Sequence, residues 1–310
     1  MLFHISKVAL AILLASNIVA NLFAQEQEKF GPIGQVELVA DGFQFLEGPA
    51  KTPDGSLYFT DIPANAIHKL SRSGKIELWQ NASNHANGLM YGGDGRLLAC
   101  EMDGQLVAYN LADGKRSVLV ETYKGTRFNA CNDLVIDRQG GIYFTDPRYR
   151  APDPWPQKQE AFYYLPNKKG SKAIRLDSGF PAPNGIILSP DEKTLYVIPS
   201  MQSKMLAYQI KSPGALGERR VFCELKQPEG EDNTGGDGLA IDVSGNLYIT
   251  AAAGVQVFSP AGKYLTTITV PQKPANCSFG GADNKTLYIT ARTGLYRCQM
   301  PIAGHQFRTE

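Results

Sequence analysis

The sequence lacks the features that mark several large classes of protein. It has no run of basic residues, and its 31 Lys and Arg nearly balance its 30 Asp and Glu, so the formal net charge is only +1. Because nucleic acids and anionic membrane surfaces attract an excess of positive charge, the sequence predicts neither as a partner. No C-x-x-C spacing joins its five cysteines, which excludes the common cysteine-rich zinc modules. We expect buried thiols instead.

Long apolar runs are also missing, except at the N-terminus. There Lys7 precedes the apolar stretch 8–15, and Ala24 stands before the polar residues 25–28. A cation, a short apolar core and a small residue before a polar stretch are typical of a secretory signal. The stretch is short for a membrane-spanning helix. We therefore predict a cleaved signal peptide over residues 1–24, an exported protein (periplasmic or secreted), and no membrane contact after cleavage; an uncleaved membrane anchor is the alternative.

What the sequence does contain is one phrase repeated six times. A polar residue, a short apolar run, a turn and an aromatic-rich apolar run recur, for example EGPAKTPDGSLYFTD from Glu47 and NDLVIDRQGGIYFTD from Asn132. Successive copies begin 40, 45, 52, 53 and 40 residues apart. Repeats of this period are the signature of blades arranged radially. We predict an all-β fold, a six-bladed β-propeller, over residues 25–310.

The two ends of the chain are predicted to close the propeller together. In each copy we expect the first apolar run to form the innermost strand of a four-stranded antiparallel blade. The last copy supplies only three strands, whereas residues 35–40, ahead of the first copy, have the pattern of a further strand. We predict that this N-terminal strand becomes the outer strand of the last blade, which would remove an open sheet edge.

A polar residue opens each innermost strand, so the sixfold arrangement would gather six of them at one mouth of the central channel. Five of the six carry side-chain oxygens, and no histidine is among them. Such a set favours one divalent cation, with Ca²⁺ first, then Mg²⁺ or Mn²⁺, and with Zn²⁺ as an alternative. The competing interpretation is that Asn-Gly and Asp-Gly are ordinary turn residues. The six positions are Glu47, Asn87, Asn132, Asn184, Asp237 and Cys277.

Four phrases resemble the gluconolactonase/regucalcin-like family, whose more distant relatives include the paraoxonases. They are FLEGPAKTPDGSLYFTD, TRFNACNDLVIDRQGGIYFTDPRY, PNGIILSPDEKTLYV and GGDGLAIDVSGNLYITA, and the resemblance spans Val36 to Cys298. It implies a propeller that binds one divalent cation at the channel mouth and hydrolyses lactones, and in some members phosphoesters. It also implies that Glu47, Asn184 and Asp237 bind the metal, with Asp237 as the general base that activates water.

The resemblance also implies residues that contact the substrate. The asparagine of the family's Asn-Asp phrase matches Asn132, which contacts the substrate in some members and the metal in others, and the preceding substrate arginine matches Arg127. Cys131 stands where many relatives carry proline, and Asn129 competes with Asn132 for the substrate role. The glutamate by which the animal lactonases hold sugar hydroxyls has no clear match near residues 143–148.

Several further residues are candidates by their position in the repeat. Asn87 lies on the predicted ring and is a candidate substrate contact. His85, two residues earlier, is either a base or substrate-orienting group, or a hydrogen-bonded loop histidine. Asp61 and Asp146 end second strands and either support the site or belong to surface turns. The segment 147–156, rich in proline, aromatic and basic residues, is either a lid over the site or a surface loop.

Three functions are compatible with this site. The first is a metal-dependent lactone hydrolase, the second a phosphotriesterase or arylesterase on the same residues, and the third a non-catalytic propeller that binds a ligand or protein. The intact set of Glu, Asn and Asp residues favours catalysis, because a pure scaffold does not need it. We expect a small lactone or ester as substrate, and a monomer or weak homo-oligomer.

Overall fold

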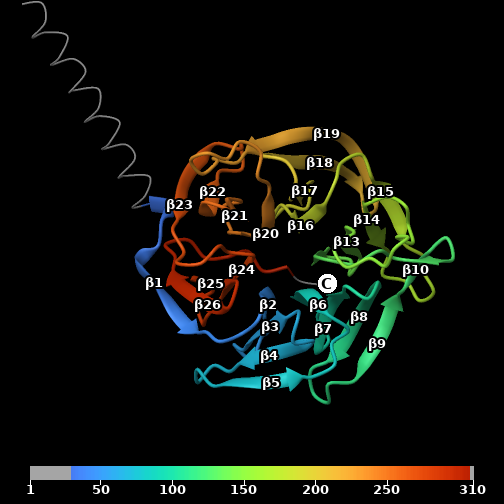
Figure 1. The fold of residues 1–310 in the computed structure, drawn as a ribbon, viewed down its shortest axis with the longest axis horizontal. Helices are drawn as coiled ribbons and strands as arrows, with labels where there is room; N and C mark the ends of the chain where they lie inside the picture. The colour runs from blue at the N-terminus through green and yellow to red at the C-terminus, as the bar shows by residue number, and fades with distance from the viewer. Residues whose placement is uncertain (1–28, 308–310) are drawn as a thin grey trace, which may run out of the picture.

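A computed structural model describes residues 29–307, and the predicted signal segment, residues 1–24, lies outside them. Regular structure in the described part consists of strands β1 to β26. They form six four-stranded antiparallel sheets and one two-stranded hairpin. The six sheets surround a common axis like blades (Figure 1). The predicted all-β, six-bladed propeller is therefore confirmed.

Each blade uses four strands that are consecutive along the chain, except the last. The first three blades are β2 (Leu46–Lys51), β3 (Leu57–Asp61), β4 (Ala66–Leu70), β5 (Ile76–Gln80); β6 (Ala86–Tyr91), β7 (Arg96–Glu101), β8 (Gln105–Asn110), β9 (Arg116–Val120); and β12 (Leu134–Ile136), β13 (Ile142–Asp146), β14 (Ala161–Leu165), β15 (Ile174–Asp177). The last three are β16 (Pro183–Leu188), β17 (Thr194–Pro199), β18 (Lys204–Ser212), β19 (Ala215–Glu224); β20 (Gly236–Ile241), β21 (Leu247–Ala251), β22 (Gly254–Phe258), β23 (Tyr264–Ile268); and β24 (Asn276–Gly280), β25 (Thr286–Ala291), β26 (Gly294–Gln299), β1 (Ile33–Ala40). The hairpin pairs β10 (Thr122–Tyr123) with β11 (Thr126–Arg127).

The N-terminal strand completes the sixth blade, as predicted. β1 pairs antiparallel with β26, and Glu37 lies opposite Arg297 in this pairing. Figure 1 shows the blue first strand beside the red last strand. The Arg297 guanidinium donates to the Glu37 carboxylate at 3.0 Å. The sixth sheet therefore contains strands from both ends of the chain. This closes the circle of blades and supplies the fourth, outer strand of blade 6.

The turn between the first and second strands of a blade is built by one aspartate. In blade 3 the Asp137 carboxylate accepts the backbone N–H groups of Gln139 and Gly141 at 2.9 and 2.8 Å. Gly140 supplies the left-handed conformation, with φ of 80°, that this turn requires. Asp242 holds the same turn of blade 5. The Asp/Gly clusters that we interpreted as turns therefore supply the carboxylate and the left-handed glycine that these turns need.

Buried threonines lock neighbouring blades together at the level of the predicted ring. The hydroxyl groups of Thr60 and Thr145 donate to the backbone carbonyls of Asn87 and Asn184, in the next blade, at 3.0 and 2.8 Å. Both threonines have no exposed surface. In blade 2 the thiol of Cys100 takes this place and contacts the carbonyl of Asp133 at 3.5 Å. These contacts fix the spacing between the first residues of adjacent inner strands.

The C-terminal segment crosses the mouth of the channel opposite the ring. The Gly304 carbonyl accepts from the Asn284 amide at 2.6 Å, and the His305 N–H donates to the carbonyl of Ile241 at 2.9 Å. Figure 1 shows the red C-terminal segment running to the centre of the blades. A cavity of about 680 Å³ lies between this segment and the level of Asp133. Its lining includes Gly48 and Asn276, near the start of inner strands, but not Glu47 or Asp237.

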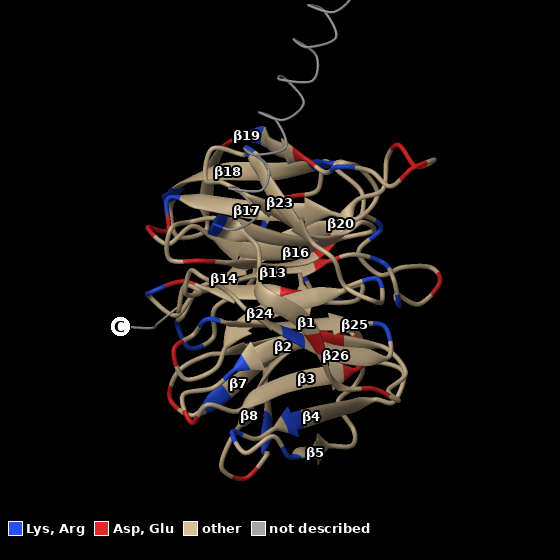
Figure 2. Ribbon diagram, turned by 90° about the vertical axis from the view of Figure 1, so that its left-hand side faces the viewer, with Lys and Arg blue, Asp and Glu red and all other residues tan. Residues whose placement is uncertain are grey.

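The side of the propeller seen in Figure 2 shows no strong bias of charge. Basic and acidic residues are intermingled over the turns and outer strands (Figure 2), in keeping with the net charge of +1. All five cysteines are buried and unbridged, as expected. In residues 29–307 no helix is long and apolar enough to span a membrane.

Candidate functional site

Six oxygen-bearing side chains open the six inner strands, one more than the sequence predicted. The prediction placed Cys277 in the sixth position, but Asn276 is the residue that lies opposite Thr290, as Glu47 lies opposite Thr60 in blade 1. The Asn276 side chain donates to the Glu47 carboxylate at 3.0 Å, so it lies within the ring. Cys277 instead buries its thiol beside the carbonyl of Tyr248. The one-residue error arose because no glycine follows Asn276, whereas glycine follows the polar residue in four of the other five copies.

Two amide–carboxylate pairs connect ring residues of adjacent blades. Asn276 of blade 6 donates to Glu47 of blade 1, and Asn184 of blade 4 donates to the Asp237 carboxylate of blade 5 at 2.6 Å. Gly238 allows the first pair to form, because a side chain there would place its Cβ 2.0 Å from Asn276. Four of the six ring side chains are therefore joined in two pairs across blade boundaries.

The orientation of the Asn184 amide follows from its partners. Its nitrogen donates to the Asp237 carboxylate and, at 2.9 Å, to the Ser200 hydroxyl. Ser200 uses its own proton to donate to the Gly236 carbonyl at 2.8 Å, so toward Asn184 it can only accept. Both partners are acceptors, which fixes the amide nitrogen on their side. The amide oxygen of Asn184 is therefore the atom left to face a ligand.

Buried carboxyl groups at the ring hold their protons unusually tightly. Burial raises the pKa of Glu47 well above its ordinary value, and the neighbouring Asp237 carboxylate raises it further. Burial raises the pKa of Asp237 to about 6, against the hydrogen bond from Asn184 and the charges of Lys273 and Arg292. Burial also raises the pKa of Asp133, next to the ring, to about 7. Negative charge is concentrated here without a matching buried cation among the described residues.

The donor set of the ring fits a hard divalent cation. Two carboxylates and the amide oxygens around them are the ligands that calcium and magnesium prefer. A cation would also offset the repulsion that raises the pKa of Glu47. Across the described part of the chain, no three His, Cys, Asp or Glu side chains cluster as a metal site of their own. Any ion at the ring would therefore depend on Asn oxygens as well as on Glu47 and Asp237.

Asn87 and Asn132 lie where the sequence placed them, at the ring. Both are buried. The Asn87 amide contacts the sulfur of Met102 at 3.8 Å, and the backbone carbonyl of Asn132 accepts from the N–H of Gly88 at 2.8 Å. Their positions complete the ring on the side of blades 2 and 3.

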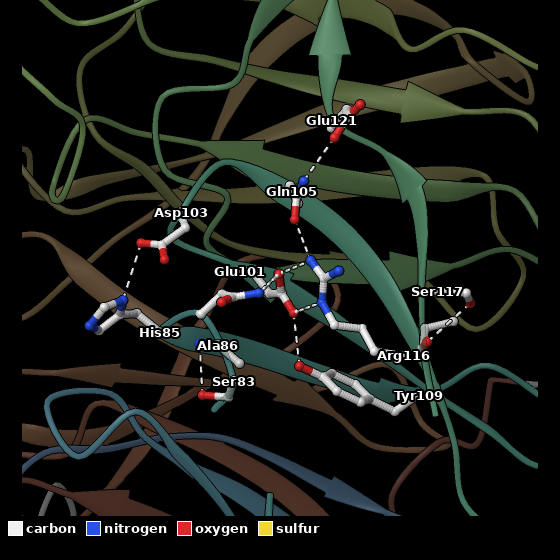
Figure 3. A network of polar contacts seen from close by, with 12 residues as sticks. Ser83, His85, Ala86, Glu101, Asp103, Gln105, Tyr109, Arg116, Ser117 and Glu121 are labelled. Atoms are coloured by element: carbon white, nitrogen blue, oxygen red, sulfur yellow. Dashed lines mark hydrogen bonds and ion pairs between the residues drawn. The ribbon is translucent and has the colours of Figure 1, made fainter. Parts of the chain in front are cut away.

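His85 lies outside the ring, in the loop that enters blade 2. Its Nδ1 atom lies 3.1 Å from the Asp103 carboxylate (Figure 3), and its backbone N–H donates to the Asn65 side chain at 2.8 Å. The residue has a left-handed φ of 54°. His85 is therefore a hydrogen-bonded loop histidine in this structure, and a role for it as a base or substrate-orienting group stays a prediction.

Asn129 and Arg127 support the loops beside the ring. The buried Asn129 amide donates to the carbonyls of Asp146 and Gln159 and accepts from the N–H of Gln157. The Arg127 guanidinium donates to the backbone carbonyls of residues 128 and 129 at 3.0 and 3.2 Å. Of the two asparagines weighed for the substrate role, Asn132 is the one at the ring. The spacing of the phrase alone could not separate them, because both follow Arg127 closely.

Asp61 and Asp146 prove to be supporting groups and not surface turn residues. Both are buried. Asp146 accepts the backbone N–H groups of Asn129 and Ala130 at 3.0 and 2.8 Å, and Asp61 does the same for the segment that enters blade 1. In blade 2 the corresponding residue is Glu101, whose carboxylate accepts from Asn84, Tyr109 and Arg116 (Figure 3). Each carboxylate therefore stabilises the loop that precedes a ring residue.

The predicted lid segment emerges on the ring side and reaches the site. It follows β13 and returns at β14, and Tyr149 within it lies near enough to Ser200, Asn184 and Asp237 for these residues to affect the pKa of its hydroxyl. Burial of the hydroxyl raises the pKa of Tyr149 to about 12. Sequence reasoning identified the segment but not this residue, and it missed Ser200, which no repeated phrase marks. Ser200 is found only through its hydrogen bond with Asn184.

Comparisons with known proteins agree with this architecture. A gluconolactonase from Zymomonas mobilis is 31% identical over 87% of this chain and 82% of its own length. Regucalcin from Bos taurus is 29% identical over 82% of this chain and 86% of its own. The solved structure of a gluconolactonase from Xanthomonas campestris has a TM-score of 0.77 at 30% identity, covering 86% of this chain and 89% of that one. Residues 45–293 match the family model described as the SMP-30/Gluconolactonase/LRE-like region, and the chain therefore belongs to that family.

Proposed function

We propose that this protein hydrolyses lactones and that its activity depends on a divalent cation held by the ring. The observation that carries the proposal is the pair of buried carboxylates, Glu47 and Asp237, each hydrogen-bonded to a ring asparagine. Burying two carboxylates near each other costs folding free energy, and a cation bound between them would offset that cost. Relatives named gluconolactonase, at 30–31% identity, support the lactone as substrate class.

Glu47, Asn184 and Asp237 would hold the cation, with Asn132 as a further ligand or a substrate contact. The Asn184 oxygen is already turned away from its hydrogen-bond partners, so no rearrangement of its amide is needed. When bound, the cation would polarise the lactone carbonyl and stabilise the developing oxyanion. All-oxygen ligation favours calcium.

Asp237 is the residue proposed to activate water. A bound cation would favour the ionised form of its carboxylate, and a carboxylate can accept a proton from water. It would take one proton from a water molecule whose oxygen attacks the lactone carbonyl carbon. The ring C–O bond then breaks, and the departing oxygen takes up that proton. The product is the open hydroxy acid, and Asp237 is returned to its starting state.

The proposal is tested by replacing Asp237 with Asn. The variant keeps a ligand oxygen and the shape of the side chain but loses the base. It also loses one ligand charge, so activity must be measured at saturating calcium. We expect lactone hydrolysis to fall by about 100-fold or more, the scale of a lost general base. Equal activity in the variant would move the base elsewhere. A wild-type protein that is inactive on lactones but active on aryl esters or phosphotriesters would redirect the proposal to those substrates.

A further inference from the structure

The residue that follows the second strand of a blade lies beside the ring. In blade 2 this residue is Met102, whose sulfur contacts the Asn87 amide at 3.8 Å. In blade 4 it is Ser200, whose hydroxyl accepts from the Asn184 amide at 2.9 Å. In blade 6 the corresponding residue is Arg292, directly after the end of β25. Because the blades repeat one architecture, this correspondence puts Arg292 at the edge of the ring.

Neighbouring segments hold the backbone of Arg292 beside Glu47. The Leu46 N–H donates to the Arg292 carbonyl at 2.8 Å, and Leu46 directly precedes Glu47. The next residue, Thr293, donates its N–H to the Gln272 side chain at 3.0 Å, and its hydroxyl accepts from the same side chain at 3.1 Å. The hairpin between β25 and β26 is therefore held on both sides, next to a ring residue.

The Arg292 side chain lies at the mouth without an acidic partner. Its guanidinium lies over the aromatic ring of Phe45, 5.2 Å from the centroid, and Phe45 stands two residues before Glu47. Arg292 is exposed, and within residues 29–307 it forms no ion pair. Phe45 in turn packs against an apolar cluster formed by Ile62, Met102 and Ala130. An unpaired cation and an apolar surface therefore border the same mouth.

A negative charge on a substrate would need a cation outside the ring. Two carboxylates, Glu47 and Asp237, would balance the charge of a bound divalent cation, which leaves little positive charge there for a further anion. Burial raises the pKa of Asp237, and the charges of Lys273 and Arg292 work against this rise, so both charges act at the ring. Of the two, Arg292 has the planar set of donors that binds a carboxylate through two hydrogen bonds.

We propose that Arg292 binds a carboxylate of the substrate and that the protein prefers lactones carrying a free carboxylate to neutral lactones. The inference rests on the proposed function. The lactone carbonyl would lie at the ring, and the free carboxylate at Arg292, beside Phe45. This carboxylate is unchanged when the lactone opens, so Arg292 holds the substrate and takes no part in proton transfer.

The test compares two lactones that differ only at C6. D-glucaro-1,4-lactone carries a carboxylate there, and D-glucono-1,4-lactone carries a hydroxymethyl group. At pH 7.5 and saturating calcium, we expect the wild type to have the higher kcat/KM for the glucarolactone. The ratio of the two kcat/KM values should fall about tenfold or more in Arg292→Gln, the scale of one charge-assisted hydrogen bond. Arg292→Lys, which keeps the charge but loses the planar donors, should give an intermediate ratio.

Arg297→Gln is the matched control. It removes the same charge from the same blade, but Arg297 pairs with Glu37 of the outer strand at 3.0 Å. Its ratio of kcat/KM values should equal that of the wild type. A wild type without preference for the glucarolactone, or an unchanged ratio in Arg292→Gln, overturns the proposal.

Binding of the products provides a readout that does not need turnover. In isothermal titration calorimetry at constant free calcium, D-glucarate should have a lower Kd than D-gluconate, and Arg292→Gln should raise the Kd for glucarate about tenfold or more. An active wild type with an unchanged glucarate Kd in the variant refutes the role of Arg292 and leaves the proposed function standing. A wild type that opens neither lactone but binds glucarate through Arg292 contradicts the proposed function and supports the carboxylate site. A wild type that does neither overturns both.

Discussion

Replacing Glu101 with Gln should destabilise the propeller far more than the loss of a surface charge would. The Glu101 side chain has no exposed surface, and its two oxygens accept four hydrogen bonds (Figure 3). One oxygen accepts from Tyr109 and Arg116, each at 2.8 Å, and the other from Arg116 and Asn84, at 2.5 and 3.0 Å. Gln keeps one acceptor oxygen but presents an N–H group to two of the four donors.

The expected loss follows from that geometry. Whichever way the Gln amide turns, one hydrogen bond from Arg116 and one from a neutral donor are lost. A charge-assisted bond is worth about 1.5–3 kcal/mol and a neutral one about 0.5–1.5 kcal/mol. Their sum is about 3 kcal/mol, near the cost of breaking a buried ion pair. For a domain of this size such a loss lowers Tm by about 6–10 °C.

The assay is thermal unfolding, with Glu37→Gln as the matched control. Glu37 pairs with Arg297 at 3.0 Å, but these side chains are 62% and 51% exposed, so the control should cost less than about 1 kcal/mol. If Glu101→Gln and Glu37→Gln lower Tm equally, then burial does not govern these ion pairs and the reasoning is wrong.

Two further predictions concern the ring itself. Gly238→Ala should push Asn276 away from Glu47, because the new Cβ would lie 2.0 Å from the Asn276 side chain. In thermal unfolding we expect this variant to be destabilised by about 1–3 kcal/mol and to be stabilised less by calcium than the wild type. Gly217→Ala is the control: the nearest atom to its new Cβ lies at 3.3 Å, so both the stability and the effect of calcium should stay unchanged. The pKa of Asp237 is raised from 3.8 to about 6, so the folded, cation-free protein binds protons more tightly than the unfolded chain and its free energy of unfolding should fall as pH rises from about 4 to about 6. Because calcium binds the ionised carboxylates, the rise in Tm on adding calcium should be larger at pH 7.5 than at pH 5, and a rise that is the same or larger at pH 5 would count against this assignment.

The fold could be predicted from the sequence because each blade repeats the same local sequence pattern. Apolar runs, Asp/Gly turns and the 40–53-residue spacing all point to the same architecture. The closing strand was predictable because the last repeat supplied only three strands. These features depend on short segments of chain and need no knowledge of distant contacts.

The site was only partly predictable, for two physical reasons. Asn276 was missed because the sixth repeat has Cys277 where four of the other repeats have glycine, which shifted the alignment by one residue. Tyr149 and Ser200 were missed because they lie in irregular segments near Asn184, and no periodic pattern specifies where such segments fold back.

The most direct test of the account is lactone hydrolysis before and after removal of the divalent cation. Purified protein should open D-glucono-1,5-lactone, lose that activity when treated with a chelator, and regain it when calcium is restored. The same cycle applied to Glu47→Gln should require a higher calcium concentration for recovery, because one of the two ring carboxylates is lost. Full activity that survives exhaustive chelation, with no metal remaining by elemental analysis, would contradict the proposed role of the ring.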